Sequence, residues 1–381
     1  MVFGLKQIIG ESTGDMMDYY DKLREKLDLF PIGFPDSEDC MKILRVLFSP
    51  EEARIASHVP NPPVMLTAGR IARKARAGAG EAERILKGLY ERNLIVSVKV
   101  LGERRYTLMP AVPGLLEMQF MRNQVIDERR AEAGRLWDES LNGEFGEENY
   151  GFPTSGARVI PINRAIDAGQ RVYSYEEAEK IIRKSGSVAI TDCACRKAAG
   201  KCDAPLDVCI MLNTSADYLA ARGLARRVTV GEALRAMERA ADAGLVPTTT
   251  NTKPPVQIIC NCCTCCCATL RGVTALGKPA QTVSSNFKCA VVHEEKCVAC
   301  GVCVEKCPMD ALSISEAGPV IDESKCVGCG VCAHHCKTGA ISLVRKSNAA
   351  PFDNSLALGA KMMLERGKIP RVLKGIAEDL L

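Results

Sequence analysis

The chain has few of the residues and motifs that mark common enzyme classes. Its 381 residues include four histidines and one tryptophan, and 5% of the residues are aromatic. No histidine belongs to a nucleophile or zincin motif, and neither a P-loop nor a Gly-x-Gly-x-x-Gly turn after a strand is present. The sequence therefore contains no motif for a catalytic centre, although a reaction carried by a metal cluster would not need one.

Long apolar segments are also missing. No apolar run reaches the ~18 residues of a membrane span. The N-terminal segment 1–7 soon meets Glu11, Asp15 and Asp18, without the apolar core of a secretory signal. We therefore expect no membrane span and a cytoplasmic location, where thiols stay reduced and available as metal ligands rather than forming a disulfide framework.

Cysteine is abundant and unevenly placed. Of twenty cysteines, Cys40 stands alone and the other nineteen lie between Cys193 and Cys336. Such crowding predicts a local metal or redox apparatus. The net charge of +4 is a modest basic excess, which hints at nucleic acid without demonstrating it.

The strongest motif is duplicated. One run reads Cys297-Val-Ala-Cys300-Gly-Val-Cys303-Val-Glu-Lys-Cys307-Pro308, and the other reads Cys326-Val-Gly-Cys329-Gly-Val-Cys332-Ala-His-His-Cys336-Lys337. Every cysteine of the first run recurs 29 residues later, which predicts two pseudo-symmetric halves. Three cysteines on a tight loop can wrap only one side of a cubane, so a fourth ligand has to come from elsewhere. A pair of zinc sites is the alternative interpretation.

This pattern resembles the bacterial ferredoxins that carry two [4Fe-4S] clusters. The resemblance implies that the fourth cysteine of each run binds the other cluster. One cluster would then be held by Cys297, Cys300, Cys303 and Cys336, and the second by Cys326, Cys329, Cys332 and Cys307. The sequence departs from the pattern at Lys337, which stands where the first run has Pro308. This difference affects the local turn and, through the ammonium charge, the potential expected of the cluster that Cys336 serves.

A second set of cysteines precedes the duplicated runs. Its members are Cys193, Cys195, Cys202, Cys209, Cys260, Cys262, Cys263, Cys265, Cys266 and Cys267. Cys289 is a candidate to join them. Adjacent side chains diverge, so neighbouring cysteines cannot all bind one cluster, but alternate ones can. We expect at least one additional iron-sulfur cluster here, as one or two cubanes or a larger cluster. Structural zinc with spare thiols is the alternative.

The hydrophobic pattern predicts an α+β multidomain protein. We expect one helix from Ser37 to about His58, two further helices and a hairpin, an order that resembles a winged-helix domain. Farther on, capping boxes at Ser174 and Thr229 predict helix starts, and Gly244 a helix end. Strands at 187–191 and 256–259 each run into a Cys-x-Cys; if they are parallel neighbours, both cysteine groups emerge at one end of a sheet.

These elements divide the chain into five predicted parts. They are a winged-helix-like domain at 36–115, a helical connector and loop at 116–155, a small Cys-rich α/β domain at 156–288, a ferredoxin-like dicluster domain of βαβ repeats at 289–345, and a helical tail at 346–381.

The whole arrangement resembles multi-domain iron-sulfur proteins of anaerobic microbes, with Asp-Cys-x-Cys-Arg and Cys-Asn-Cys-Cys motifs in the middle domain. That resemblance implies electron transfer to or from a redox partner protein, either an oxidoreductase or another ferredoxin. Two alternatives stay open. One is a redox-sensing regulator that binds DNA through the winged-helix segment, which acidic residues in the third helix make less favourable. The other is an oxidoreductase with a catalytic cluster in the middle domain.

Overall fold

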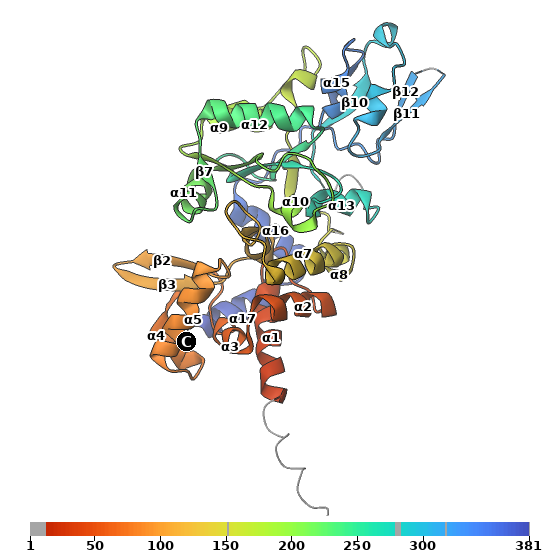
Figure 1. The fold of residues 1–381 in the computed structure, drawn as a ribbon. Coiled ribbons are helices and arrows are strands. Elements are labelled where there is room, and N and C mark those ends of the chain that lie inside the picture. The colour runs from red at the N-terminus through yellow and green to blue at the C-terminus, as the bar shows by residue number, and fades with distance from the viewer. Residues whose placement is uncertain (1–12, 151, 279–282, 317, 381) are drawn as a thin grey trace, which may run out of the picture. The chain divides into compact units, whose positions relative to one another are not determined.

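The chain folds into two compact units (Figure 1). The computed structural model describes residues 13–150, 152–278, 283–316 and 318–380. The segment in which no secretory signal was found lies partly outside these residues. Unit 1 comprises residues up to Gln119, Asp127–Ser140 and the segment from Gly367, and unit 2 comprises Phe120–Ile126 and Leu141–Arg366. Helices and small sheets occur together, so the predicted α+β class is confirmed. Within the described ranges, no helix has the length and apolar character needed to span a membrane.

Unit 1 is mainly helical. Its elements are α1 (Thr13–Asp28), α2 (Glu38–Leu47), α3 (Pro50–Ala56), β1 (Leu66–Thr67), α4 (Ala68–Lys74), α5 (Ala79–Glu91), β2 (Val96–Val100), β3 (Glu103–Thr107), the irregular turn η1 (Ala111–Leu115), α6 (Leu116–Met118), α7 (Glu128–Ser140) and α17 (Ile369–Leu380). The three strands form an antiparallel sheet in the order β1-β3-β2, which includes the predicted hairpin.

The single helix predicted from Ser37 to His58 is wrong, because the chain breaks between α2 and α3. Ser49 accepts a hydrogen bond from the Glu52 N–H, and the Glu52 carboxylate accepts one from the Ser49 N–H, which closes a capping box. Pro50 has no N–H to continue α2 but suits the first position of a new helix. A local cap therefore prevails over a continuous apolar pattern.

The C-terminal helix α17 packs within unit 1. Asp379 is buried, receives a hydrogen bond from the Asn61 N–H, and pairs with Lys26 at 2.7 Å. Lys368, just before α17, pairs with Asp28 at 2.6 Å, and both of these side chains are buried. These ion pairs join the two ends of the sequence, which the apolar spacing of the tail alone did not indicate.

Unit 2 holds both cysteine-rich regions. Its first elements are α8 (Glu144–Asn149), β4 (Ala157–Val159), η2 (Asn163–Ala165), η3 (Ser174–Glu176), α9 (Ala178–Arg183), β5 (Val188–Thr191), α10 (Ala194–Ala199), β6 (Cys209–Leu212), α11 (Asn213–Ala221), β7 (Arg226–Arg227), α12 (Val230–Asp242), β8 (Val246–Thr250), β9 (Ile258–Cys262) and α13 (Ala268–Thr274). The remainder are β10 (Phe287–Val291), η5 (Glu294–Lys296), α14 (Val302–Glu305), β11 (Leu312–Ser315), β12 (Gly318–Ile321), α15 (Val331–His335), β13 (Ile341–Arg345) and α16 (Ser355–Glu365).

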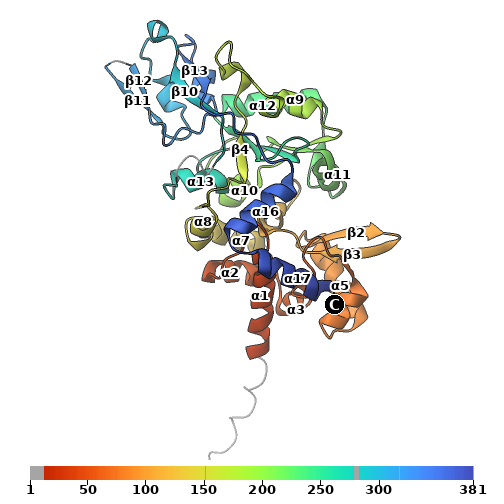
Figure 2. The ribbon, with the colours of Figure 1, turned by 180° about the vertical axis from the view of Figure 1, so that it is seen from behind.

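A six-stranded sheet in the order β4-β8-β9-β6-β5-β7 forms the middle of unit 2. Helices α9 and α12 lie on one side of it and α10 and α13 on the other (Figure 2). On the α9 and α12 side, Ile182 and Ala236 pack against Ile190, Ile210 and Ile259. The cysteines that alternate with these isoleucines along the strands therefore face α10 and α13.

The strands that precede the two Cys-x-Cys groups are not the parallel neighbours that we expected. They are β5 and β9, and β6 lies between them, antiparallel to both. β6 was missed because its four residues begin at Cys209, inside a cysteine-rich stretch with no alternation. Two antiparallel steps still give β5 and β9 the same direction, so both cysteine groups leave the sheet at the same end.

The predicted helix signals have mixed outcomes. Thr229 and Glu232 form the expected capping box of α12, and Gly244 follows its end with φ +74°. The box predicted at Ser174 is wrong: α9 begins at Ala178, after the short 3₁₀ turn η3. The carboxylate that the motif requires is that of Glu177, which instead pairs with Lys180 at 2.6 Å. The Glu176 carboxylate accepts the Tyr173 N–H and pairs with Arg345 at 2.7 Å.

The internal repeat recurs in three dimensions. Helices α14 and α15 begin 29 residues apart, as do β11 and β13. Strand β10 pairs with β13, and β11 pairs with β12, both antiparallel. We call residues 287–345 the duplicated segment.

Candidate metal centres

The first cavity of the duplicated segment has sulfur on several sides. It is partly open to solvent. Its cysteines are Cys297, Cys300, Cys303 and Cys336. Cys300 is exposed. Cys336 belongs to the second cysteine run, so the chain crosses from one half to the other at this cavity.

The second cavity is built in the same way. Its cysteines are Cys289, Cys307, Cys326, Cys329 and Cys332. Cys307 comes from the first run, so the crossing is reciprocal. The sets of four that the ferredoxin resemblance implies thus line separate cavities, and a fifth thiol is present in the second.

Glycines allow the backbone to approach closely around the second cavity. Gly328 has φ +65°, and a Cβ atom there would lie 2.0 Å from the Phe287 carbonyl oxygen. At Gly330, with φ +86°, a Cβ atom would lie 2.8 Å from that of Ala165. Any larger residue would push the cysteine loop away from the strand and turn that support it.

Lys337 does not change the turn that follows the fourth cysteine. Asp310 in the first half and Gly339 in the second are equivalent and both have positive φ, +49° and +70°. The surroundings of the sulfurs differ more. Burial raises the pKa of Cys307, although the Ala311 N–H donates to its sulfur at 3.3 Å. For Cys336 burial acts in the same direction, but hydrogen bonds from backbone N–H groups and the Thr338 hydroxyl outweigh it and lower the pKa.

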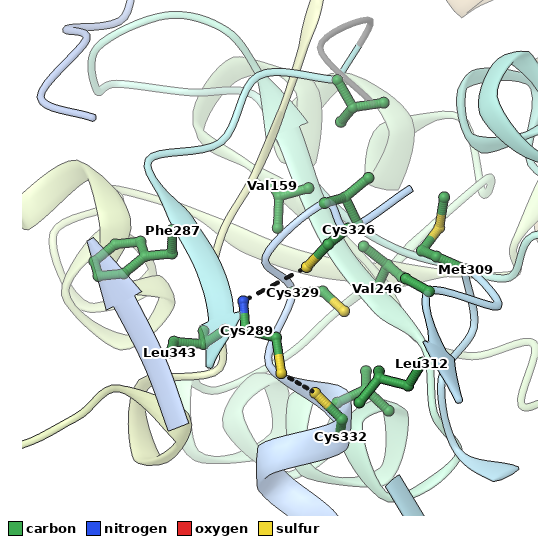
Figure 3. Packing of buried hydrophobic residues seen from close by; sticks show 14 of the residues in the cluster. Val159, Val246, Phe287, Cys289, Met309, Leu312, Cys326, Cys329, Cys332 and Leu343 are labelled. Carbon is green, nitrogen blue, oxygen red and sulfur yellow. Dashed lines mark hydrogen bonds between the residues drawn. The ribbon is translucent and has the colours of Figure 1, made fainter. Parts of the chain in front are cut away.

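Cys289, a candidate for the middle group, lies instead at the second cavity. Its sulfur is 3.4 Å from that of Cys332, and its N–H donates to the Cys326 sulfur at 3.5 Å (Figure 3). It is buried on β10 among Phe287 and Leu343. The pairing of β10 with β13, which a sequence repeat alone does not specify, brings it there.

Residues 296–340 match the family model of the 4Fe-4S dicluster domain. No curated protein and no solved structure matches the chain significantly. The match covers both cysteine runs and supports iron-sulfur electron transfer. We refer to residues 296–340 as the dicluster domain.

In the middle of unit 2, three cysteines share the sheet face that α10 and α13 cover. Ile210 pairs with Ile259, and one step farther along this register Cys209 comes opposite Cys260. Cys262, two residues on, points to the same face, and its sulfur lies 3.3 Å from the Thr248 hydroxyl.

Three more cysteines reach this end of the sheet from the adjoining turns. Cys193 precedes α10, Cys195 lies in its first turn, and Cys267 precedes α13. We call the six the sheet-end group: Cys193, Cys195, Cys209, Cys260, Cys262 and Cys267.

Hydrogen bonds between thiols connect the sheet-end group. Those from Cys195 and Cys209 hold the pKa of Cys193 well below its ordinary value. Those from Cys260 and Cys267 do the same for Cys262. The neighbouring thiols have raised pKa values, because each donates its proton to a thiolate. Thiols crowded in this way are a donor set that suits a metal site, because metal binding deprotonates them.

The remaining four middle cysteines form a separate group. Their sulfur atoms all lie within 4.8 Å of one another. They are Cys202, Cys263, Cys265 and Cys266. We call them the four-thiol group. The sequence predicted ten thiols in this region, but it could not show that they divide into six and four.

Arg196 lies between the two groups. Its side chain is 1% exposed, and its Nη1 donates to the Asn261 carbonyl oxygen at 3.0 Å. Burial alone would lower its pKa, but the negative charge of Cys193 and a hydrogen bond to Cys263 raise it. Thiolates are thus the counter-charge of this buried guanidinium.

Proposed function

We propose that the chain is an iron-sulfur electron-transfer protein with two [4Fe-4S] clusters in its dicluster domain. The observation that carries this proposal is the reciprocal crossing of the cysteines. Each cavity takes three sulfurs from one run and the fourth from the other, Cys336 in the first cavity and Cys307 in the second. Four thiolates per cubane is the ligand number that such clusters require.

The donor set fits the cofactor in chemistry as well as in number. Thiolate sulfur is the preferred ligand of iron-sulfur clusters, and bound clusters exchange single electrons. The chain contributes backbone N–H groups that can hydrogen-bond to sulfur, as at Cys307 and Cys326. It also contributes apolar walls, including Ile314 at the first cavity and Leu343 at the second, which limit the access of water.

The exposure of the two cavities suggests where a partner protein docks. Val298, in the loop between Cys297 and Cys300, is 68% exposed, and Ile314 and Val320 are also exposed. We propose that a redox partner, an oxidoreductase or another ferredoxin, approaches the dicluster domain at the first cavity. The second cavity belongs to a buried core that also contains Val246 and Cys262 of the sheet.

We further propose that the sheet-end group holds an additional iron-sulfur cluster. Six thiols are two more than one cubane needs, so they can accommodate a cluster larger than a single cubane. The core shared by Cys262, Cys267 and the second cavity keeps this site and the dicluster domain in one apolar environment. A chain of redox sites within unit 2 would suit a protein that relays electrons.

Unit 1 is better suited to docking a protein than to binding DNA. We propose a winged-helix-like domain at 36–115. The exposed side chains of α5 include Glu83 and Glu91 beside Arg84 and Lys87, and the acidic ones repel phosphate. Two basic side chains of α4, Arg70 and Lys74, donate hydrogen bonds to carbonyl oxygens of α17, which reduces their availability to a nucleic acid. The other predicted domain boundaries also remain proposals.

Purification without oxygen, followed by iron and acid-labile sulfide analysis and EPR of the dithionite-reduced protein, tests this function. At least about eight irons and eight sulfides per chain, with the spectrum of two interacting S = 1/2 clusters, are expected for the dicluster domain. More iron and sulfide than this would support the sheet-end cluster. A folded, colourless protein without sulfide would refute the proposal. Salt-dependent retention on DNA would favour the regulator instead.

A further inference from the structure

The four-thiol group is too compact for a cubane. The sulfurs of Cys202 and Cys263 are 3.8 Å apart, and those of Cys265 and Cys266 are 3.6 Å apart. All four sulfurs lie within 4.8 Å of one another. Four irons and four sulfides do not fit between thiolates at this spacing, because each thiolate of a cubane binds a different corner of the cluster.

The spacing fits a single ion. A tetrahedral zinc or iron ion with metal–sulfur bonds of about 2.3 Å places its sulfurs about 3.8 Å apart, since a tetrahedron's edge is roughly 1.6 times its centre-to-corner distance. The two distances given above are close to this edge. Neither sulfur–sulfur distance is as long as the spacing between thiolates that bind different corners of a cubane.

The dicluster cavities provide an internal comparison. Among the residues that the structure describes, the four-thiol group alone brings three or more potential ligand atoms within 4.8 Å of one another. The four cysteines at each dicluster cavity are therefore more widely spread, as a larger cofactor requires. The same holds for the sheet-end group. One chain thus contains two kinds of cysteine site that differ in size.

The local chain geometry explains why the middle cysteines divide into the sheet-end group and the four-thiol group. Cys262 and Cys263 are adjacent at the end of β9, so their side chains point in opposite directions, Cys262 to the sheet-end group and Cys263 to the four-thiol group. Cys266 and Cys267 diverge in the same way. A turn brings the Cys267 N–H to the Cys263 carbonyl oxygen at 3.1 Å and gathers Cys263, Cys265 and Cys266 on one side.

The surroundings also suit a bound ion. Cys263 and Cys266 are buried against Val208 and Leu245, whereas Cys265 is exposed. Four thiolates around a divalent ion carry a net charge of about −2. Arg196 supplies a compensating positive charge: its Nε and Nη2 atoms are buried without an oxygen acceptor, and the Cys263 thiol faces the guanidinium. A buried cation of this kind requires an anionic partner.

We propose that Cys202, Cys263, Cys265 and Cys266 bind one tetrahedral divalent ion, zinc or iron, without sulfide. This centre is distinct from the iron-sulfur clusters. The ion fixes the loop after α10 to the turn after β9, because Cys202 comes from the former and the other three ligands from the latter. The role is structural in the first instance, since all four coordination positions belong to the protein.

The test compares metal content in full-length variants prepared without oxygen. Cys265→Ser is the principal variant, because Cys265 is exposed and its replacement leaves the core intact. It should lose one zinc or one iron per chain, with sulfide and the EPR spectrum of the dicluster domain unchanged. Cys202→Ser should behave alike. Where the ion is zinc, X-ray absorption of the parent protein at the zinc edge should show four sulfurs at about 2.3 Å.

Two matched variants serve as controls. Cys195→Ser removes a thiol of the sheet-end group and should leave the single ion in place. Cys40→Ala removes a cysteine of unit 1, outside both groups, and should change neither metal nor sulfide. Circular dichroism confirms that each variant is folded.

Three results would overturn the proposal. One is a loss of about four irons together with about four sulfides in Cys265→Ser, which would indicate a cubane. Another is unchanged metal content in both Cys265→Ser and Cys202→Ser. The third is a parent protein in which these thiols are oxidised and metal-free. The clusters of the proposed function are counted separately by sulfide and EPR, so either proposal can fail without the other.

Discussion

Val298 and Val327 occupy equivalent positions, 29 residues apart, in the two halves of the dicluster domain, yet Val298 is 68% exposed and Val327 is 1% exposed. The difference arises because the second half packs against the rest of unit 2. The Ile162 N–H donates to the Cys329 carbonyl oxygen at 3.0 Å, and Val327 lies in the core that includes Val246. Two cavities that are similar in sequence therefore differ in their access to solvent.

This asymmetry predicts that the first cavity loses iron sooner than the second. An iron chelator added with a mild oxidant should release iron in two phases, because Cys300 is exposed and Cys329 is buried. The fast phase should contain about four irons from the first cavity. Stopped-flow absorbance measures the phases, and EPR of samples quenched after the fast phase should show a single cluster without the coupling to its neighbour. One phase for all the iron would contradict the prediction.

The different burial of Val298 and Val327 predicts that replacing each with alanine affects the stability of the protein differently. Val327→Ala should lower the free energy of unfolding by about 2 kcal/mol, because it removes buried methyl groups and leaves a cavity. Val298→Ala should change it by less than about 0.5 kcal/mol, as for most exposed positions. Anaerobic denaturant unfolding of the cluster-loaded protein measures both. Equal effects would mean that the second half does not pack as described.

Crossed ligation predicts which cluster each fourth cysteine serves. Cys336→Ser should weaken the cluster at the first cavity, although Cys336 lies in the second run, and Cys307→Ser should weaken the one at the second cavity. Each variant should lose up to about four irons. In the chelation experiment, Cys336→Ser should abolish the fast phase and Cys307→Ser the slow phase. The opposite assignment would show that each run binds its own cluster.

The position of Cys289 predicts that the second cavity tolerates the loss of one ligand, Cys332. Its sulfur lies 3.4 Å from that of Cys332, within the same cavity. A small movement could therefore bring Cys289 to the iron that Cys332 leaves. Cys332→Ala should keep most of its iron, Cys289→Ala should keep all of it, and the double variant should lose about four irons. Cys329→Ala is the matched single variant, because no spare thiol contacts Cys329 among the described hydrogen bonds, and it should lose the cluster outright.

The sequence predicted what depends on local spacing and failed where distant segments decide. The duplicated runs, the Thr229 capping box and the β2–β3 hairpin follow from residues close together in the chain. The interruption at Ser49 was also local, but the apolar pattern on both sides concealed it. In contrast, the insertion of β6 between β5 and β9 depends on strand pairing. The pairing of Glu176 with Arg345 in front of α9 likewise joins residues that are remote in sequence.

The cysteine sites also combine features that local spacing predicts with features that depend on distant segments. Ligand spacing identified the thiols of the dicluster domain, and the fifth thiol, Cys289, became apparent only through the pairing of β10 with β13. In the middle of unit 2, alternation predicted that neighbouring cysteines diverge. Which of them converge depends on β8 and β9, on the turn after Cys262, and on the position of Arg196.

Arg196 provides the last prediction, since both thiol groups of the middle region face its charge. Replacing it with methionine, which is similar in length but neutral, removes the counter-charge of buried thiolates and should weaken metal binding there by about 10- to 100-fold. Any sheet-end cluster that remains should have a lower reduction potential, because a nearby positive charge favours the more negative reduced state. Arg196→Lys keeps the charge and should retain most of the metal. Metal analysis, sulfide analysis and EPR-monitored redox titration measure these changes, with the dicluster signals as the internal control. Unchanged metal content and potential in Arg196→Met would show that the guanidinium serves only to hold Asn261 in place.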